Sequence, residues 1–193
     1  MNTKKTLNRA VLVHGYMGTP KGGWFPWLKK ELEKKEFETH TPFMPTPSKP
    51  KMKKWVSKIA DVIGNPDEKT FLIGYSLGCV AVLRYLESIN NQIGGAVLVA
   101  GFGQKPEGKY KDLDNFFETP LDWKKINQNC KKFNIIHSDD DYAVPVENAH
   151  LLNKNLNSEL ILKHGMEHFG GDTGVFKLPD ALEAVLKLSE MVK

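Results

Sequence analysis

The chain has 193 residues, of which 40% are hydrophobic and 26% are charged, with a formal net charge of +4 at pH 7. This length suits one well-buried core, so we expect a single domain over residues 1–193. No apolar run approaches the roughly 20 residues that a membrane span needs, so we expect no membrane partner. No basic stripe interleaved with aromatic residues is present, so we expect no nucleic-acid partner.

The cysteine content and the N-terminus bear on the compartment. Cys79 and Cys130 are too few for a disulfide framework and suit a reducing environment. The basic N-terminus precedes a brief apolar run at Ala10–Val13 that His14-Gly15 ends, which favours a first strand over an export signal. We therefore expect a cytoplasmic protein.

Strand-like and helix-like stretches alternate along the chain. Apolar or alternating runs predict strands at 10–13, 37–43, 71–75, 95–100, 133–137 and 160–163. Amphipathic spacing predicts helices at 24–35, 52–63, from 77 onward, at 146–156 and at 178–192. The proline-dense segment 42–50 and the segment 101–121 are predicted to be loops. This alternation predicts an α/β fold, a doubly wound and mostly parallel sheet with helices on both faces.

The pentapeptide Gly74-Tyr75-Ser76-Leu77-Gly78 fits the Gly-x-Ser-x-Gly pattern at a strand-to-helix junction. A serine hydroxyl is a weak nucleophile, and a sharp turn presents it clear of the backbone where a base can take its proton. Glycines lack the Cβ atoms that would collide where strand and helix cross closely. We therefore predict a nucleophile elbow with Ser76 as the nucleophile; an ordinary tight turn is the alternative.

Two later strands end in residues that complete a Ser-acid-His order. The strand at 133–137 is followed by Asp139-Asp140-Asp141, and Asp141 precedes Val144-Pro145 in an Asp-x-x-Val-Pro pattern. The strand at 160–163 is followed by a loop that carries His168. We predict Asp141 as the orienting acid and His168 as the general base.

Several alternatives stay open around this constellation. Asp140 is the reserve acid, although Asp139 and Asp140 are both expected to cap backbone N–H groups in the turn. His164 is the reserve base. The segment from His164 to His168 also fits the zinc-protease pattern H-x-x-E-H, but Gly165 opposes the helix that this pattern requires, so we expect no metal and no other cofactor.

The developing oxyanion needs N–H donors, and the sequence offers two near Ser76. We predict the N–H of Leu77, just after the nucleophile, and that of Tyr16, in the loop after the first strand. Aromatic and sulfur-containing side chains in the loops are candidates for the wall of an apolar substrate pocket, with packing as the alternative. These candidates are Trp24, Met44, Phe102, Phe116 and Phe169.

The chain resembles the small single-domain serine hydrolases grouped with retinoblastoma-binding protein nine. The resemblance spans nearly the whole length and is carried by Gly22-Gly23-Trp24, Trp27 to Leu32, Met44-Pro45, Gly74 to Gly78, Arg84-Tyr85, Phe117 to Trp123, Asp140-Asp141 with Pro145, and His168-Phe169. It implies a compact α/β-hydrolase without a large cap domain that acts through Ser76, Asp141 and His168.

The first prediction of function is therefore a serine hydrolase that cleaves an ester, thioester or small amide of a small-molecule acyl substrate through an acyl-serine intermediate. A non-catalytic binding protein on a hydrolase scaffold is the alternative, since a fold does not guarantee chemistry. A metal-dependent hydrolase is the third hypothesis.

Overall fold

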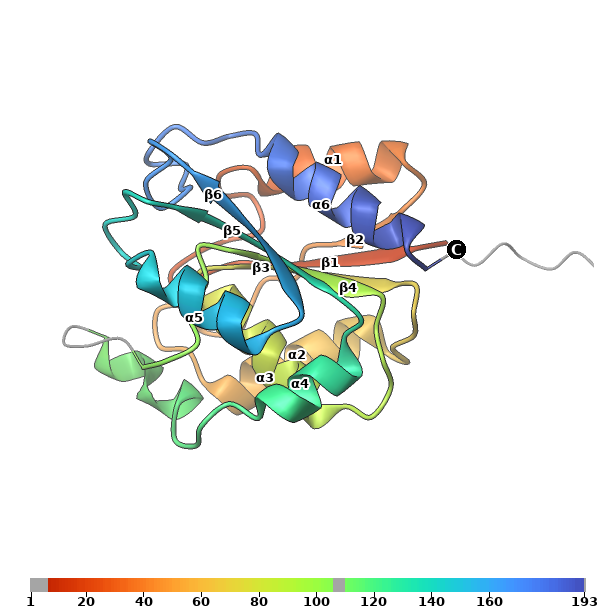
Figure 1. Ribbon diagram of the computed structural model, residues 1–193, viewed down its shortest axis with the longest axis horizontal. Helices are drawn as coiled ribbons and strands as arrows, with labels where there is room; N and C mark the ends of the chain where they lie inside the picture. The colour runs from red at the N-terminus through yellow and green to blue at the C-terminus, as the bar shows by residue number, and fades with distance from the viewer. Residues whose placement is uncertain (1–6, 106–109, 193) are drawn as a thin grey trace, which may run out of the picture.

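In the described part of the chain, six strands form one sheet in the order β2-β1-β3-β4-β5-β6, and every neighbouring pair is parallel (Figure 1). The computed structural model describes residues 7–105 and 110–192. The strands are β1 (Arg9–Val13), β2 (Glu38–His40), β3 (Thr70–Tyr75), β4 (Gly95–Val99), β5 (Phe133–Ser138) and β6 (Ser158–Lys163). The sequence-based prediction of a doubly wound parallel sheet is confirmed.

Helices cover both faces of this sheet, as Figure 1 shows. One face carries α1 (Phe25–Lys34) and α6 (Pro179–Glu190), which contact each other as well as the strands. The opposite face carries α2 (Met52–Ile63), α3 (Leu77–Ser88), α4 (Trp123–Asn129) and α5 (Glu147–Asn155). None of the helices among the described residues is long and apolar enough to cross a membrane.

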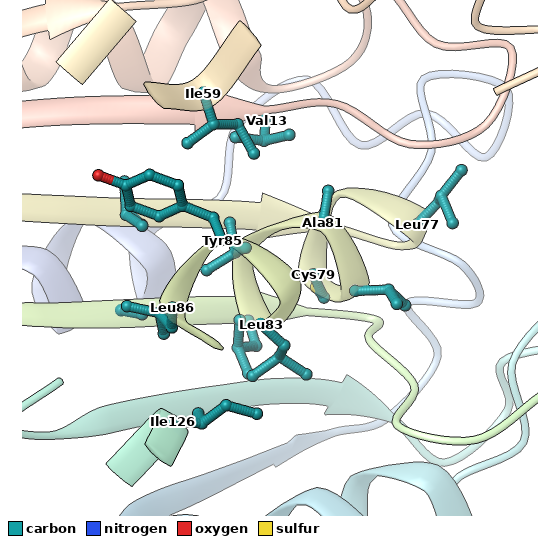
Figure 2. Close-up of a cluster of buried hydrophobic side chains, with 14 of the residues drawn as sticks. Val13, Ile59, Leu77, Cys79, Ala81, Leu83, Tyr85, Leu86 and Ile126 are labelled. Carbon is teal, nitrogen blue, oxygen red and sulfur yellow. The ribbon is translucent and has the colours of Figure 1, made fainter. Parts of the chain in front are cut away.

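The core is divided by the sheet into two clusters of buried side chains. In β3, Leu72 faces the cluster under α2 and α3, whereas Phe71 and Ile73 face the cluster under α1 and α6. Strands buried on both faces need apolar residues at odd and even positions alike, which explains the uninterrupted apolar runs in β3 and β4. Figure 2 shows α3 lying over the strands, with Cys79, Leu83 and Leu86 among the side chains of the buried cluster on this face.

Some details differ from the sequence-based prediction. The second strand ends at His40 rather than at residue 43, because Pro42 and Pro45 lack the N–H that a strand ladder needs. The predicted loop at 101–121 contains a 3-10 helix, η1 (Lys111–Phe116), and is followed by α4, which was not predicted. Asp122, the residue before α4, caps this helix: its side chain accepts a hydrogen bond from the Lys125 N–H at 3.0 Å.

The buried side chain of Arg84, in α3, binds the segment that connects β4 to β5. Its guanidinium donates to the Phe116 carbonyl at 2.8 Å and to the Thr119 carbonyl, and it pairs with Glu87 at 2.8 Å. Arg84 is only 6% exposed, so these acceptors replace the water that its charge has lost. Among the described residues, the segment between β4 and β5 holds η1 and α4 and no separate cap domain.

The strand order reverses at the carboxyl ends of β1 and β3. The chain leaves β1 toward α1 on one face and leaves β3 toward α3 on the other, so the two following loops diverge. In open parallel sheets, this reversal of strand order is where ligands bind. Ser76 follows β3 at this point.

The close approach of α3 to β1 depends on Gly78. A Cβ at this position would lie 2.0 Å from the Val13 carbonyl oxygen, which is backbone and has little room to move. Gly78→Ala is expected to lower the free energy of unfolding by about 3 kcal/mol or more, because overpacking against backbone forces a shift. Urea denaturation measures this change. Gly22→Ala, whose Cβ would meet its nearest neighbour at 3.4 Å, serves as the matched control. Equal stability of the two variants would contradict the account of this contact.

Candidate active site

Ser76 sits in a strained turn between β3 and α3. Its φ of 52° and ψ of −120° are rare for a residue with a side chain, and strain of this kind persists where the surroundings enforce it. The Ser76 N–H donates to the Val99 carbonyl at 2.9 Å, which ties the turn to β4. A Cβ on Gly74 would lie 2.7 Å from the Cα of Cys79, so the turn also needs glycine there.

The structure brings the three predicted catalytic residues into one hydrogen-bonded row. His168 Nε2 lies 3.1 Å from Ser76 Oγ. His168 Nδ1 lies 2.8 Å and 3.0 Å from the two carboxylate oxygens of Asp141. Because a carboxylate accepts, Nδ1 carries the proton toward Asp141, and Nε2 is left as the acceptor that faces the Ser76 hydroxyl.

The carboxylate of Asp141 is fully buried and well supplied with donors. The backbone N–H groups of Ala143 and Val144 donate to Asp141 Oδ1 at 2.9 Å and 2.8 Å. Backbone donors of this kind stabilise a carboxylate charge that burial would otherwise disfavour. The side chain of His168 is 14% exposed, so the row reaches solvent only at its histidine and serine end.

The other two aspartates of the triplet hold the histidine loop without facing Ser76. Asp139 pairs with the exposed His164 at 2.8 Å, and this hydrogen bond raises the pKa of His164. Asp140 accepts from the Ser138 hydroxyl and from the Glu167 N–H at 2.9 Å, and the Ser138 hydrogen bond lowers the pKa of Asp140. Asp140 and His164, the reserve candidates, therefore lie outside the Ser76–His168–Asp141 row.

The H-x-x-E-H segment is a loop and not a helix, as the glycine within it predicts. Gly165 has a φ of 69°, and Glu167 and Phe169 on either side of His168 have φ values of 46° and 56°. The two histidines bind different aspartates. In residues 7–105 and 110–192, no group of three or more His, Cys, Asp or Glu side chains is placed to hold a metal ion.

Tyr75 is a contributor that the sequence analysis did not single out. Its hydroxyl donates to the His168 carbonyl at 2.7 Å, and its ring lies 5.3 Å from the imidazole between centroids. Burial raises the pKa of Tyr75, so its hydroxyl remains a donor. Its position as the last residue of β3, next to the elbow serine, is the signal that could have indicated this contact.

The loop after β1 lies directly against the elbow. A Cβ on Gly15 would lie 3.0 Å from the Cβ of Ser76, so the backbone at Gly15 and Tyr16 borders the serine. Leu77 is the first residue of α3, where an N–H has no partner within the helix. Within the described part of the chain, no hydrogen bond engages the N–H of Tyr16 or of Leu77.

His14 shapes this loop. It is 2% exposed, its Nδ1 donates to the Gly15 carbonyl at 2.9 Å, and its Nε2 accepts from the Met44 N–H at 3.0 Å. Both ring nitrogens are therefore occupied, and burial lowers the pKa of His14. His14 fixes the path of the chain beside Ser76 and has no nitrogen left to serve as a base.

A pocket of about 170 Å³ lies between the loop after β1 and the histidine loop. Two of the five predicted wall residues, Trp24 and Phe169, line it together with Tyr75 and a set of glycines. Neither Ser76 nor His168 lines it, but Tyr75 and Phe169 are their direct neighbours in the chain. The glycines are Gly18, Gly22, Gly23, Gly170 and Gly171.

The other three predicted wall residues do not line this pocket, and packing, the alternative role, describes their position. Met44, Phe102 and Phe116 are 0%, 5% and 0% exposed and belong to the core cluster on the α3 face of the sheet. Phe116 packs edge-on against Trp55, with ring centroids 5.9 Å apart. All three side chains bury their apolar surface in this cluster.

The parallel sheet and the elbow at its switch point define an α/β-hydrolase. A family model described as serine hydrolase matches residues 10–187, and the chain belongs to this family of hydrolases. It is 34% identical over 174 residues to the putative hydrolase YdeN of Bacillus subtilis (strain 168), a match that covers 89% of this chain and 90% of that protein. It is 28% identical over 164 residues to the serine hydrolase RBBP9 of Rattus norvegicus, covering 83% and 87%.

Solved structures agree with this assignment. The crystal structure of the ydeN gene product from B. subtilis matches with a TM-score of 0.89 and 30% identity, over 94% of this chain and 98% of that chain. Est1E from Butyrivibrio proteoclasticus matches with a TM-score of 0.70 and 16% identity, over 96% and 91%. The second likeness concerns the fold alone. The expected membership in a small α/β-hydrolase family is confirmed.

Two buried histidines make the stability of the protein depend on pH. Burial lowers the pKa of His14 and of His137 below the ordinary 6.5, so below pH 6.5 these two side chains bind more protons in the unfolded chain than in the folded one. The free energy of unfolding should therefore fall as the pH drops from 7 to 5, by up to about 1.4 kcal/mol per pH unit for each histidine. Denaturant titrations at several pH values measure the slope. His14→Gln and His137→Gln should each flatten it, and slopes equal to that of the unaltered protein would contradict the assignment.

Proposed function

We propose that the chain hydrolyses an ester, thioester or small amide through an acyl-Ser76 intermediate. The observation that carries this proposal is the row in which His168 lies 3.1 Å from Ser76 Oγ and 2.8 Å from Asp141. In this reaction His168 takes the proton of the Ser76 hydroxyl as Oγ attacks the acyl carbon, and it passes the proton to the leaving group. His168 then activates water, which releases the acid and restores Ser76.

Asp141 orients the imidazole and stabilises the imidazolium that forms during attack. It stays a carboxylate throughout, supported by its two backbone N–H donors. The N–H groups of Leu77 and Tyr16 donate hydrogen bonds to the substrate oxygen and stabilise the negative charge that develops on it. Loss of one such donor typically costs about 3 kcal/mol of transition-state stabilisation.

The pocket beside the elbow favours a compact substrate. An apolar cavity of about 150 Å³ holds a benzene molecule, so a pocket of about 170 Å³ suits a ring or a short chain of about six carbons. Trp24 and Phe169 give it an apolar wall, and Asp172 supplies a carboxylate beside it. We propose small neutral acyl compounds of carboxylesterase type as substrates, and a cytoplasmic location, in keeping with two free and buried cysteines.

If the chain were a non-catalytic binding protein, the hydrogen-bonded row of Ser76, His168 and Asp141 would have no function. A binder needs the pocket but not a serine in a strained turn with an imidazole nitrogen facing its hydroxyl. The geometry therefore favours the enzyme. Loss of activity on treatment with chelators would favour the metal-dependent alternative.

Ser76→Ala tests the proposed nucleophile. The variant removes only the hydroxyl, so it should fold normally while losing both hydrolysis of p-nitrophenyl acetate and labelling by a fluorophosphonate probe. Gel fluorescence and absorbance assays measure the two losses. The matched control is Ser189→Ala, which alters a buried serine of α6 whose hydroxyl donates to the Leu186 carbonyl, away from His168. Persistent labelling of the Ser76→Ala protein would overturn the assignment.

The aspartate triplet permits a paired comparison. Asp141→Asn replaces the acceptor that orients His168 and is expected to lower kcat by a factor on the order of 10³–10⁴. Asp140→Asn affects only the hydrogen bonds to Ser138 and Glu167, and kcat should stay within about tenfold. Steady-state kinetics on an activated ester separate the two variants. A larger loss in Asp140→Asn would assign the orienting role to the wrong carboxylate.

The pocket volume predicts a limit on chain length. Along p-nitrophenyl esters from acetate to decanoate, kcat/KM should peak at about four to six carbons and fall at least about tenfold by decanoate, because longer chains exceed the pocket. A spectrophotometric series at constant pH gives the profile. A rate that keeps rising to decanoate would show that the acyl chain binds elsewhere.

A further inference from the structure

His137 is a buried titratable group that the proposed reaction leaves unused. It lies in β5, four residues before Asp141, and its side chain is 0% exposed. His137 Nε2 lies 2.9 Å from the Val144 carbonyl oxygen. Because a carbonyl oxygen only accepts, Nε2 carries the proton and donates it to Val144.

The other ring nitrogen of His137, Nδ1, makes no hydrogen bond with the described residues. With Nε2 protonated, a neutral imidazole leaves Nδ1 as a bare acceptor, and this buried atom has no hydrogen-bond partner within the described residues. An unsatisfied buried acceptor costs about 1–3 kcal/mol. An aliphatic side chain would fill the same space without that cost. The advantage of a histidine at this position is therefore the hydrogen bond from Nε2 to the Val144 carbonyl.

The hydrogen bond of His137 acts on the turn that supplies donors to Asp141. Val144 accepts from His137 through its carbonyl group and donates through its N–H to Asp141 Oδ1 at 2.8 Å. His137 Nε2 also lies 3.7 Å from Asp141 Oδ2, the oxygen nearer to His168 Nδ1. The separation of 3.7 Å is too long for a hydrogen bond, so the main connection runs through Val144.

We propose that His137 is a positioning residue that holds the Val144 peptide in place and thereby aims the Asp141 carboxylate at His168. This inference rests on the proposed function, since it concerns the acid of the same row. The ionisable groups that act on His137 are Asp141, His168 and His150. Burial lowers the pKa of His137, so it stays neutral near pH 7 and does not compete with His168 as a base.

A pair of substitutions of equal length tests the proposal. His137→Gln keeps an N–H donor near the position of Nε2, whereas His137→Met has a similar shape and no donor. His137→Met should lower kcat for p-nitrophenyl acetate by about 10- to 100-fold with little change in KM, since a small misplacement in a catalytic group costs that much. It should also move the acid limb of the kcat/KM profile to lower pH, because a poorly aimed Asp141 stabilises the His168 imidazolium less. His137→Gln should stay within about threefold of the unaltered protein.

Phe133→Leu, at the start of the same strand, controls for a loss of stability away from Asp141. The proposal is overturned if His137→Met keeps the kcat and the acid limb of this control, or if His137→Gln is as slow as His137→Met. Failure of the proposed function looks different: the unaltered protein would then neither hydrolyse the ester nor react with a fluorophosphonate. An active unaltered protein together with an unaffected His137→Met variant refutes the positioning role alone.

Discussion

The site depends on the close approach of α3 to the carboxyl end of β1. Gly78 has no side chain, and a Cβ there would overlap the Val13 carbonyl, so this contact exists only with glycine. It brings the turn at Ser76 against the loop that begins at His14 and Gly15. The close contact of these two backbones therefore places the loop after β1 beside the strained turn at Ser76.

The loop that carries Asp141 and the loop that carries His168 are joined by several hydrogen bonds. The three aspartates after β5 each bind a different part of the histidine loop: Asp139 the side chain of His164, Asp140 the N–H of Glu167, and Asp141 the imidazole of His168. Tyr75 holds the same loop from the side of β3 through the His168 carbonyl. A histidine flanked by two residues with positive φ keeps one orientation because several contacts enforce it.

The sequence predicted those features that are set by local patterns. Apolar runs located the strands, and the order of Ser76, Asp141 and His168 at strand ends predicted residues that the fold brings together, since carboxyl ends of parallel strands share one edge. The position of Met44, Phe102 and Phe116 could not be predicted, because burial of a loop side chain depends on space left by distant elements. The sequence analysis also missed two contacts. Only the place of Tyr75 beside Ser76 indicates its contact with the histidine loop, and the contact of His137 with Val144 depends on how the turn after β5 folds.

The central claim is that Ser76 becomes covalently acylated. Its most direct test is to mix the protein with p-nitrophenyl acetate, quench in acid within the first turnover, and map the peptides by mass spectrometry. The account predicts one acetyl group on the peptide that contains Ser76, with a burst of p-nitrophenol of matching stoichiometry. Steady hydrolysis with no adduct, or with the acetyl group on a different residue, would contradict it.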